Sequence, residues 1–180
     1  PDWWVILARS LDKSDPAIAI GGLRMAIALR GDNAVLRNDL GAILLQQKRL
    51  KEAAMQFQAA DQLRPGFAPA RFNLALCTIS DRNRDQAIVL LGQYLGQRPG
   101  DTAALRLLST LLSQNDHAAE ALHLLEKFLK NQPTTQPLFL EAAMLAARLG
   151  QTGNALRYLE TSLGGNPVQA VIRAYQSPAF

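Results

Sequence analysis

The sequence predicts an all-α fold in which five helix-turn-helix repeats stack into a right-handed α-α superhelix, or solenoid, followed by a short C-terminal capping helix. Three observations lead to this prediction. Prolines recur every 34 residues, apolar residues recur at helical spacing inside each period, and no segment has the strict alternation of apolar and polar residues that is typical of a strand. The 180 residues are 48% hydrophobic and 19% charged, a composition typical of a folded chain.

The repeat is visible first in its prolines and alanines. Four prolines stand 34 residues apart, at Pro65, Pro99, Pro133 and Pro167. Twelve residues before each of them lies an alanine, and one further period back lies another: Ala19, Ala53, Ala87, Ala121 and Ala155. A fixed period of this length is the mark of a repeat architecture, so the chain is divided into five copies. Their bounds are residues 1–33, 34–67, 68–101, 102–135 and 136–169.

Each copy is expected to contain two amphipathic helices. In the second copy, apolar residues at helical spacing form two groups, Leu40 to Leu44 and Met55 to Leu63, which the polar hinge 46–49 separates. The same outline returns in the other copies. A proline lacks an N–H and restricts the residue before it, so each proline of the ladder is expected to end a second helix. The expected ends lie near Arg64, Arg98, Gln132 and Asn166.

Capping residues indicate where several of these helices begin. Asp15 precedes Pro16, which pairs an N-cap with proline at the first helical position and so starts the second helix of the first copy. Capping oxygens are expected from the pairs 32–33, 101–102 and 115–116 as well. Beyond the fifth copy, an apolar stripe at i, i+3, i+4 and i+7 predicts the capping helix over residues 168–176. This stripe consists of Val168, Val171, Ile172 and Tyr175.

Small residues predict how the two helices of a copy pack. One position on the first helices carries Gly41, Ala75, Ser109 and Ala143. The alanines of the repeat are expected to lie opposite them on the second helices. Side chains this small let two helices approach to the near end of the usual separation of roughly 8–10 Å.

Residues 1–180 are interpreted as one solenoid domain. The chain opens Pro-Asp-Trp-Trp without an initiator Met, so we expect it to be a piece of a longer protein. A targeting signal is expected outside these residues, and the sequence leaves a cytoplasmic and a periplasmic location open. The usage of Ala, Leu, Gln and Arg in the helices is typical of bacterial proteins.

No catalytic, cofactor or metal site is predicted. His117 and His123 are six residues apart and fall on different sides of a helix, and Cys77 is interpreted as a small buried hydrophobe. The longest apolar run, from Trp3 to Ala8, is too short to cross a membrane, which takes about 20 residues. Acids interrupt the basic residues throughout, although residues 33–100 carry the whole surplus charge of +4. We therefore expect neither a nucleic-acid partner nor direct membrane insertion.

The repeat resembles the tetratricopeptide repeat family, whose 34-residue unit pairs two antiparallel helices around small residues and ends in proline. The likeness is carried in the second copy by Leu40, Gly41, Ala53, Phe57, Ala60 and Pro65, and in the fifth by Gly150, Ala155 and Pro167. An aromatic residue expected early in the first helix is present as Trp3 and Phe139 and replaced by Arg37, Arg71 and Leu105 in the middle copies.

The resemblance implies a concave groove lined by the first helices. Its lining residues on this chain would be Trp4, Asn38, Asp39, Phe72, Asn73, Leu76, Arg106, Thr110, Leu140, Glu141 and Met144. We expect the two asparagines to bond the backbone of an extended ligand and Arg106 to hold a carboxylate. The apolar members would accept apolar side chains, or alternatively would pack between adjacent first helices. The clamp that some family members use for chaperone tails is absent, because only Asn73 matches it.

Two functions from different classes follow. The first is a non-catalytic protein–protein interaction scaffold that binds a peptide segment or an amphipathic helix in the groove. The alternative is a self-assembly module that forms a homo-oligomer through the groove or the solenoid ends. RNA reading by the related pentatricopeptide architecture would require a 35-residue period and a base-reading pair in each copy, and neither is present.

Overall fold

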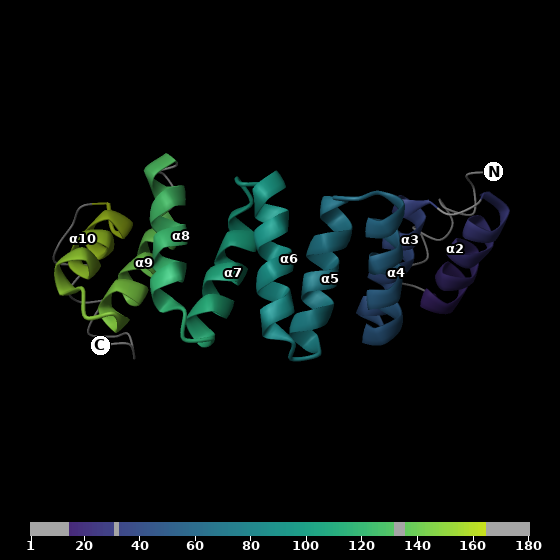
Figure 1. The fold of residues 1–180 in the computed structure, drawn as a ribbon, viewed down its shortest axis with the longest axis horizontal. Coiled ribbons are helices and arrows are strands. Elements are labelled where there is room, and N and C mark those ends of the chain that lie inside the picture. The colour runs from purple at the N-terminus through teal and green to yellow at the C-terminus, as the bar shows by residue number, and fades with distance from the viewer. Residues whose placement is uncertain (1–14, 31–32, 132–135, 165–180) are drawn as a thin grey trace. The chain divides into compact units, whose positions relative to one another are not determined.

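The computed structural model describes residues 15–30, 33–131 and 136–164, and this part of the chain consists of nine helices and contains no strand (Figure 1). The helices are α2 (Pro16–Arg30), α3 (Ala34–Gln46), α4 (Leu50–Leu63), α5 (Ala68–Ser80), α6 (Arg84–Gln97), α7 (Thr102–Gln114), α8 (Ala118–Asn131), α9 (Gln136–Arg148) and α10 (Thr152–Ser162). The predicted all-α class is confirmed. The first helix of the first copy and the capping helix over 168–176 lie outside the described residues.

The helix bounds follow the 34-residue period. Within each of the last four copies, three residues connect the first helix to the second: 47–49, 81–83, 115–117 and 149–151. The helices α4, α6 and α8 end two residues before their prolines, as the missing N–H of proline predicts. The exception is α10, which ends at Ser162, well before Asn166. Gly164 follows with a φ of +70°, a left-handed conformation that glycine adopts readily and that closes a helix.

Most of the predicted capping residues do cap helices. Asp15 accepts a hydrogen bond from the Ile18 N–H at 3.2 Å, and Asn33 accepts one from the Val35 N–H at 2.8 Å. Asp101 accepts from the N–H groups of Ala103 and Ala104. The pair 115–116 differs, because the Asn115 N–H bonds to the carbonyls of Leu111 and Leu112 and so closes α7. A further cap, which was not predicted, is Asn83, whose side chain accepts a hydrogen bond from the Gln86 N–H and caps α6.

The connections inside the copies share one strained position. Lys48, Arg82, Asp116 and Gly150 occupy it, with φ values of +58°, +62°, +63° and +73°. A side chain with a Cβ is unfavourable in this left-handed region, whereas glycine adopts it at little cost. Three copies therefore hold a non-glycine residue where the fifth has Gly150.

Two compact units make up the chain, Pro1–Arg98 and Pro99–Phe180, referred to below as unit 1 and unit 2. The alanines of the repeat, Ala19, Ala53, Ala87, Ala121 and Ala155, are at most 2% exposed. In unit 1 the core gathers around Leu23, Leu44 and Phe57, all at most 1% exposed. In unit 2 the Tyr158 hydroxyl of α10 donates to Glu126 of α8 at 2.5 Å.

The small residues of the first helices are buried, as predicted, but Gly41 has a different nearest neighbour. A Cβ on Gly41 would lie 2.6 Å from the Phe57 ring, one helical turn beyond Ala53. The close approach of α3 and α4 is therefore shaped by the aromatic ring. The equivalent residue of the fourth copy, Ser109, is 1% exposed and its hydroxyl has no hydrogen-bond partner among the described residues.

Candidate functional site

The predicted groove residues lie on the first helices of the copies. Asn38 and Asp39 are on α3, while Phe72, Asn73 and Leu76 are on α5 of unit 1. Arg106 and Thr110 are on α7, while Leu140, Glu141 and Met144 are on α9 of unit 2. Trp4 lies outside the described residues. The structure brings several of these residues together in pairs inside each unit.

In unit 1, the two asparagines bond to each other. Asn73 donates through Nδ2 to Oδ1 of Asn38 at 3.0 Å, and both residues are half-buried. A carboxamide has two N–H donors and an acceptor oxygen, so this bond uses only part of what each side chain offers. The pair fixes both amide groups in one orientation, a contact between copies that the sequence analysis did not foresee.

The apolar members of unit 1 are partly covered. The Phe72 ring packs against Tyr94 of α6, with ring centroids 5.1 Å apart and planes inclined by 42°. Leu76 is half-buried on the same helix. Phe72 therefore takes part in the packing of its own copy and leaves only some of its surface for a ligand.

In unit 2, Arg106 and Glu141 form an ion pair, with Nε and Oε2 3.4 Å apart. The Glu141 side chain is 20% exposed and that of Arg106 is 61% exposed, so the guanidinium is the accessible partner. Nearby along the same two helices, Arg148 donates to the carbonyl and the hydroxyl of Ser113, both at 3.0 Å.

These contacts share a spacing of 35 residues. It joins Asn38 to Asn73, Arg106 to Glu141, and Ser113 to Arg148. A residue on one first helix thus faces the residue one period and one place further along the chain. Complementary side chains at this spacing were the signal in the sequence that could have found the pairs.

Two large apolar side chains are exposed on α9. Leu140 is 41% exposed and Met144 is 43% exposed, and four residues apart they lie one turn from each other on the helix. Glu141 stands between them in sequence, and Thr110 on α7 is exposed as well. The exposed pair Leu140 and Met144 is next to the accessible guanidinium of Arg106. In unit 2 this is the arrangement that can receive a partner.

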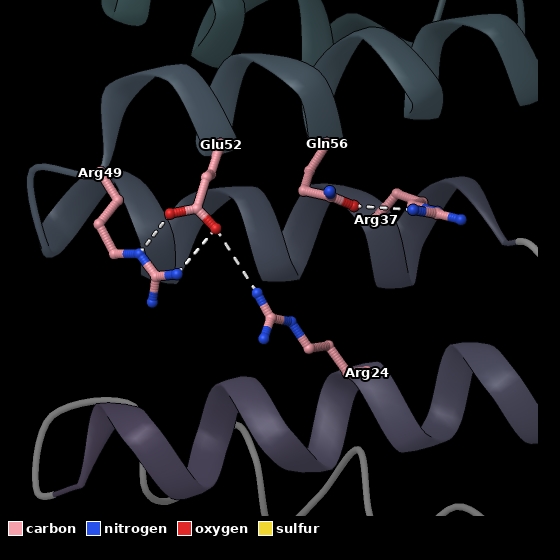
Figure 2. Close-up of polar contacts among 5 residues, drawn as sticks. All are labelled: Arg24, Arg37, Arg49, Glu52 and Gln56. Carbon is pink, nitrogen blue, oxygen red and sulfur yellow. Dashed lines mark hydrogen bonds and ion pairs between the residues drawn. The ribbon is translucent and has the colours of Figure 1, made fainter.

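A polar network outside the predicted groove ties three helices of unit 1 together. Figure 2 shows Glu52 of α4 between Arg49, at 2.7 Å, and Arg24 of α2, at 3.5 Å. The bond from Arg49 lowers the pKa of Glu52. Arg37 of α3 reaches Gln56 of α4 at 2.9 Å. This network was not predicted, because it joins positions that no repeat motif relates.

The remaining titratable groups fit structural roles. Cys77 is 2% exposed, as expected of a small hydrophobe, and burial raises the pKa of its thiol to about 11. His117 and His123 are both exposed, and Nδ1 of His117 lies 2.9 Å from Glu120. Among the described residues, no group of three or more His, Cys, Asp or Glu side chains is placed to hold a metal ion. None of the described helices combines the length and apolarity needed to cross a membrane.

Comparison with known sequences finds one family and several relatives. Residues 44–111 match the model of the tetratricopeptide repeat family. FlbA of Caulobacter vibrioides is 27% identical over 162 residues, which are 89% of this chain and 27% of FlbA. The peroxisomal targeting signal receptor of Candida albicans is 32% identical over 123 residues, which are 68% of this chain and 18% of the receptor. The chain thus spans about a quarter or less of the length of these relatives.

Solved structures share the fold over nearly the whole chain. MamA superposes with a TM-score of 0.78 at 15% identity, covering 91% of this chain and 90% of MamA. YrrB, a tetratricopeptide repeat protein, superposes with a TM-score of 0.75 at 18% identity, covering 97% of this chain and 91% of YrrB. At these identities the likeness concerns the fold, and it confirms the predicted class, an α-α solenoid of helix-turn-helix repeats.

Proposed function

Because the chain is a tetratricopeptide repeat protein, we propose that it acts as a non-catalytic protein–protein interaction scaffold that binds a peptide segment or an amphipathic helix on its first helices. Two of the similar proteins support a scaffold of this kind. YrrB is described as having an unusual peptide-binding site, and the receptor of Candida albicans is named for the targeting signal of peroxisomal proteins.

The observation that carries the proposal is the exposure of Leu140 and Met144 on α9. Several large apolar side chains are exposed among the described residues, and most of them lie on second helices. On the first helices the exposed ones are Val35, Leu140 and Met144, and the last two leave 41% and 43% of their surface in water one turn apart. Covering this surface with the apolar side chains of a partner would contribute about 1–2 kcal/mol of binding free energy.

Polar groups on the first helices of each unit would orient a partner segment bound to that unit. The Nε–H of Arg106 is directed to Glu141, and a guanidinium carries five N–H donors, so its exposed edge can hold a carboxylate of the partner. In unit 1 the paired carboxamides of Asn38 and Asn73 keep donors and acceptors suited to an extended backbone. The preferred ligand is therefore a peptide with apolar residues followed or preceded by an acid.

Selection from a random twelve-residue peptide library would test the proposal. We expect selected peptides to bind the wild type about tenfold more tightly than the double variant Leu140→Ser, Met144→Ser. The matched control is Val89→Ser, Leu156→Ser, which removes two large apolar side chains that are exposed by 57% and 49% on second helices. Equal binding to all three proteins, or no enrichment of any peptide, would contradict the proposal.

Light scattering over a concentration series distinguishes this function from self-assembly. A monomer in both the wild type and the Leu140→Ser, Met144→Ser variant supports a foreign partner. A wild-type dimer that the double variant dissociates would mean that the surface holds a second copy of the chain, and self-assembly would replace the proposed function.

A further inference from the structure

A pocket of about 260 Å³ opens among α4, α5 and α6 of unit 1, and none of its lining residues belongs to the predicted groove. Its lining residues are Leu50, Lys51, Ala54, Met55, Gln58, Leu74, Cys77, Thr78, Asp81, Asn83 and Gln86. The volume is below the roughly 300–1,000 Å³ typical of sites for small molecules and cofactors. It suits a single side chain.

The pocket exists because the repeat is interrupted at Ala54. The 34-residue period places Ile20, Ile88, Leu122 and Leu156 at the same position of the other four copies. Of these, Ile20 and Leu122 are 6% and 3% exposed, Ile88 is half-buried and Leu156 is 49% exposed, so the aliphatic side chain at this position is packed in two copies and partly packed in a third. In the second copy a methyl group stands in its place.

The floor of the pocket carries two further reductions. Cys77 replaces the residue that is Ile43, Leu111 and Leu145 in other copies. Thr78 occupies a position that is leucine in two of the three other described copies, as Leu44 and Leu112. Ala54 and Cys77 are therefore smaller than every counterpart, and Thr78 is smaller than Leu44 and Leu112 but not than Ala146. The side chain that the space lacks is the aliphatic one that the other copies carry at the position of Ala54.

The polar side chains at the bottom of the pocket, Thr78 and Cys77, do not require a hydrogen bond from a ligand. The Thr78 hydroxyl donates to the Ala75 carbonyl at 2.8 Å, and burial keeps the Cys77 thiol in its neutral form. Thr78, Cys77 and Leu74 are at most 8% exposed. The floor therefore offers apolar contact without competing for hydrogen bonds. At the rim, the 64% exposed Met55 has a flexible thioether that adapts to the shape of an incoming group.

The surroundings of the pocket favour an acidic partner. The segments 46–52 and 80–86, which contribute to its mouth, carry five Lys or Arg residues and three Asp or Glu residues. Arg49 and Glu52 pair with each other, and the lining itself holds one exposed base, Lys51, and one exposed acid, Asp81, so the basic surplus comes from Lys48, Arg82 and Arg84 in the turns around the mouth. Electrostatic complementarity of this kind selects the partner and speeds its association.

We propose that this pocket is a second binding site, which receives one leucine or isoleucine side chain from an acidic segment of a partner protein. The aliphatic side chain replaces the one that Ala54 lacks, and neighbouring carboxylates of the partner lie against Lys51 and the basic turns. The site is independent of the first-helix surface, so the scaffold can hold two partner segments at once.

The three methionines of the chain provide separate reporters for a direct test. Met55 lies at the rim of the pocket, Met144 on the first-helix surface, and Met25 on α2. With methyl-¹³C methionine, each reports binding in its own neighbourhood by NMR even when affinity is weak. The probes are twelve-residue peptides with one central Leu or Ala, flanked by Glu or by Lys.

We expect the peptide with Leu between glutamates to shift the Met55 methyl signal and to leave those of Met144 and Met25 in place. Replacing its Leu by Ala, or its glutamates by lysines, should weaken binding at least tenfold. The substitution Ala54→Leu restores the residue type of the repeat and fills the pocket, so it should remove the Met55 shift while preserving the fold.

Controls keep the result interpretable. Lys51→Glu should abolish the preference for the acidic peptide, whereas Lys127→Glu on α8 should leave the Met55 shift unchanged. An absence of any Met55 shift, a shift that persists in Ala54→Leu, or a shift confined to Met144 would overturn the proposal. A concentration-dependent dimer that Ala54→Leu dissociates would also overturn it, by assigning the pocket to a second copy of the chain.

Discussion

Replacing Gly41 by alanine tests how rigidly the helices of the second copy are packed. The added Cβ would lie 2.6, 2.8 and 2.9 Å from three carbons of the Phe57 ring, where ordinary van der Waals contacts are 3.4–4 Å. Phe57 is fully buried in the core of unit 1, so moving its ring disturbs the packing of the side chains around it. We therefore expect Gly41→Ala to destabilise the protein.

The magnitude follows from two opposed effects. Overpacking a rigid core costs about 1–3 kcal/mol, and replacing glycine by alanine inside a helix gains about 1 kcal/mol. The net loss for Gly41→Ala is then about 1 kcal/mol. Gly92 in α6 provides the control, because a Cβ there meets nothing within 4 Å. Gly92→Ala should therefore gain about 1 kcal/mol, and the difference between the two variants isolates the clash.

Urea denaturation followed by far-ultraviolet circular dichroism measures both variants. A double variant, Gly41→Ala with Phe57→Leu, closes the cycle: removing the ring should make the alanine less harmful than it is in the wild-type background. The reasoning would be refuted if Gly41→Ala stabilised the protein as much as Gly92→Ala, because the ring would then yield without cost.

Three further changes have definite expected outcomes. Ser109→Ala should stabilise the protein by about 1 kcal/mol in urea, because it removes a buried hydroxyl that has no partner among the described residues, and a loss of stability would contradict this. Gly150→Ala should destabilise the protein by about 1 kcal/mol, since alanine is strained at a φ of +73°. Arg82→Gly at the equivalent turn is the control and should have the opposite effect, because it relieves the strain at a φ of +62°. Burial raises the pKa of Cys77 from 9.0 to about 11, so its contribution to stability is complete below pH 9 and is lost as the pH rises from 9 to 11. Urea titrations at pH 7.5 and 10.5 should show wild type losing more stability than Cys77→Ala, and equal losses would contradict the shift.

The sequence was sufficient to predict the helices because their signals are local and repeated. Proline removes an N–H wherever it stands, and the three helices that precede Pro65, Pro99 and Pro133 end two residues earlier. The same holds for the buried alanines, which recur at one position of each copy. The segment Gly164-Gly165-Asn166 was also expected to be a helix C-terminus, and α10 does end at Ser162, where Gly164 closes it before the proline position is reached.

The candidate site was less accessible to sequence reasoning, because it depends on which residues face each other across copies. The positions of Asn38, Asn73, Arg106 and Glu141 on the first helices were predicted, and their pairing was not. The pairing depends on a 35-residue offset between facing positions, which follows from the stagger of neighbouring helices and not from the 34-residue period. The partial cover of Phe72 by Tyr94 likewise required coordinates.

A repeat protein contains its own reference for what each position requires. Where packing alone decides, the copies agree, as they do at the five alanines that are at most 2% exposed. A departure that weakens packing has no structural benefit to its own copy. Ala54 is such a departure, because the other four copies have isoleucine or leucine at this position and two of these side chains, Ile20 and Leu122, are buried. Where such a departure leaves a pocket with exposed and charged side chains at its rim, a partner can insert the aliphatic side chain that the repeat lacks at that position. Filling the space with Ala54→Leu should therefore raise stability while removing binding, and this opposite response separates a binding pocket from a packing defect.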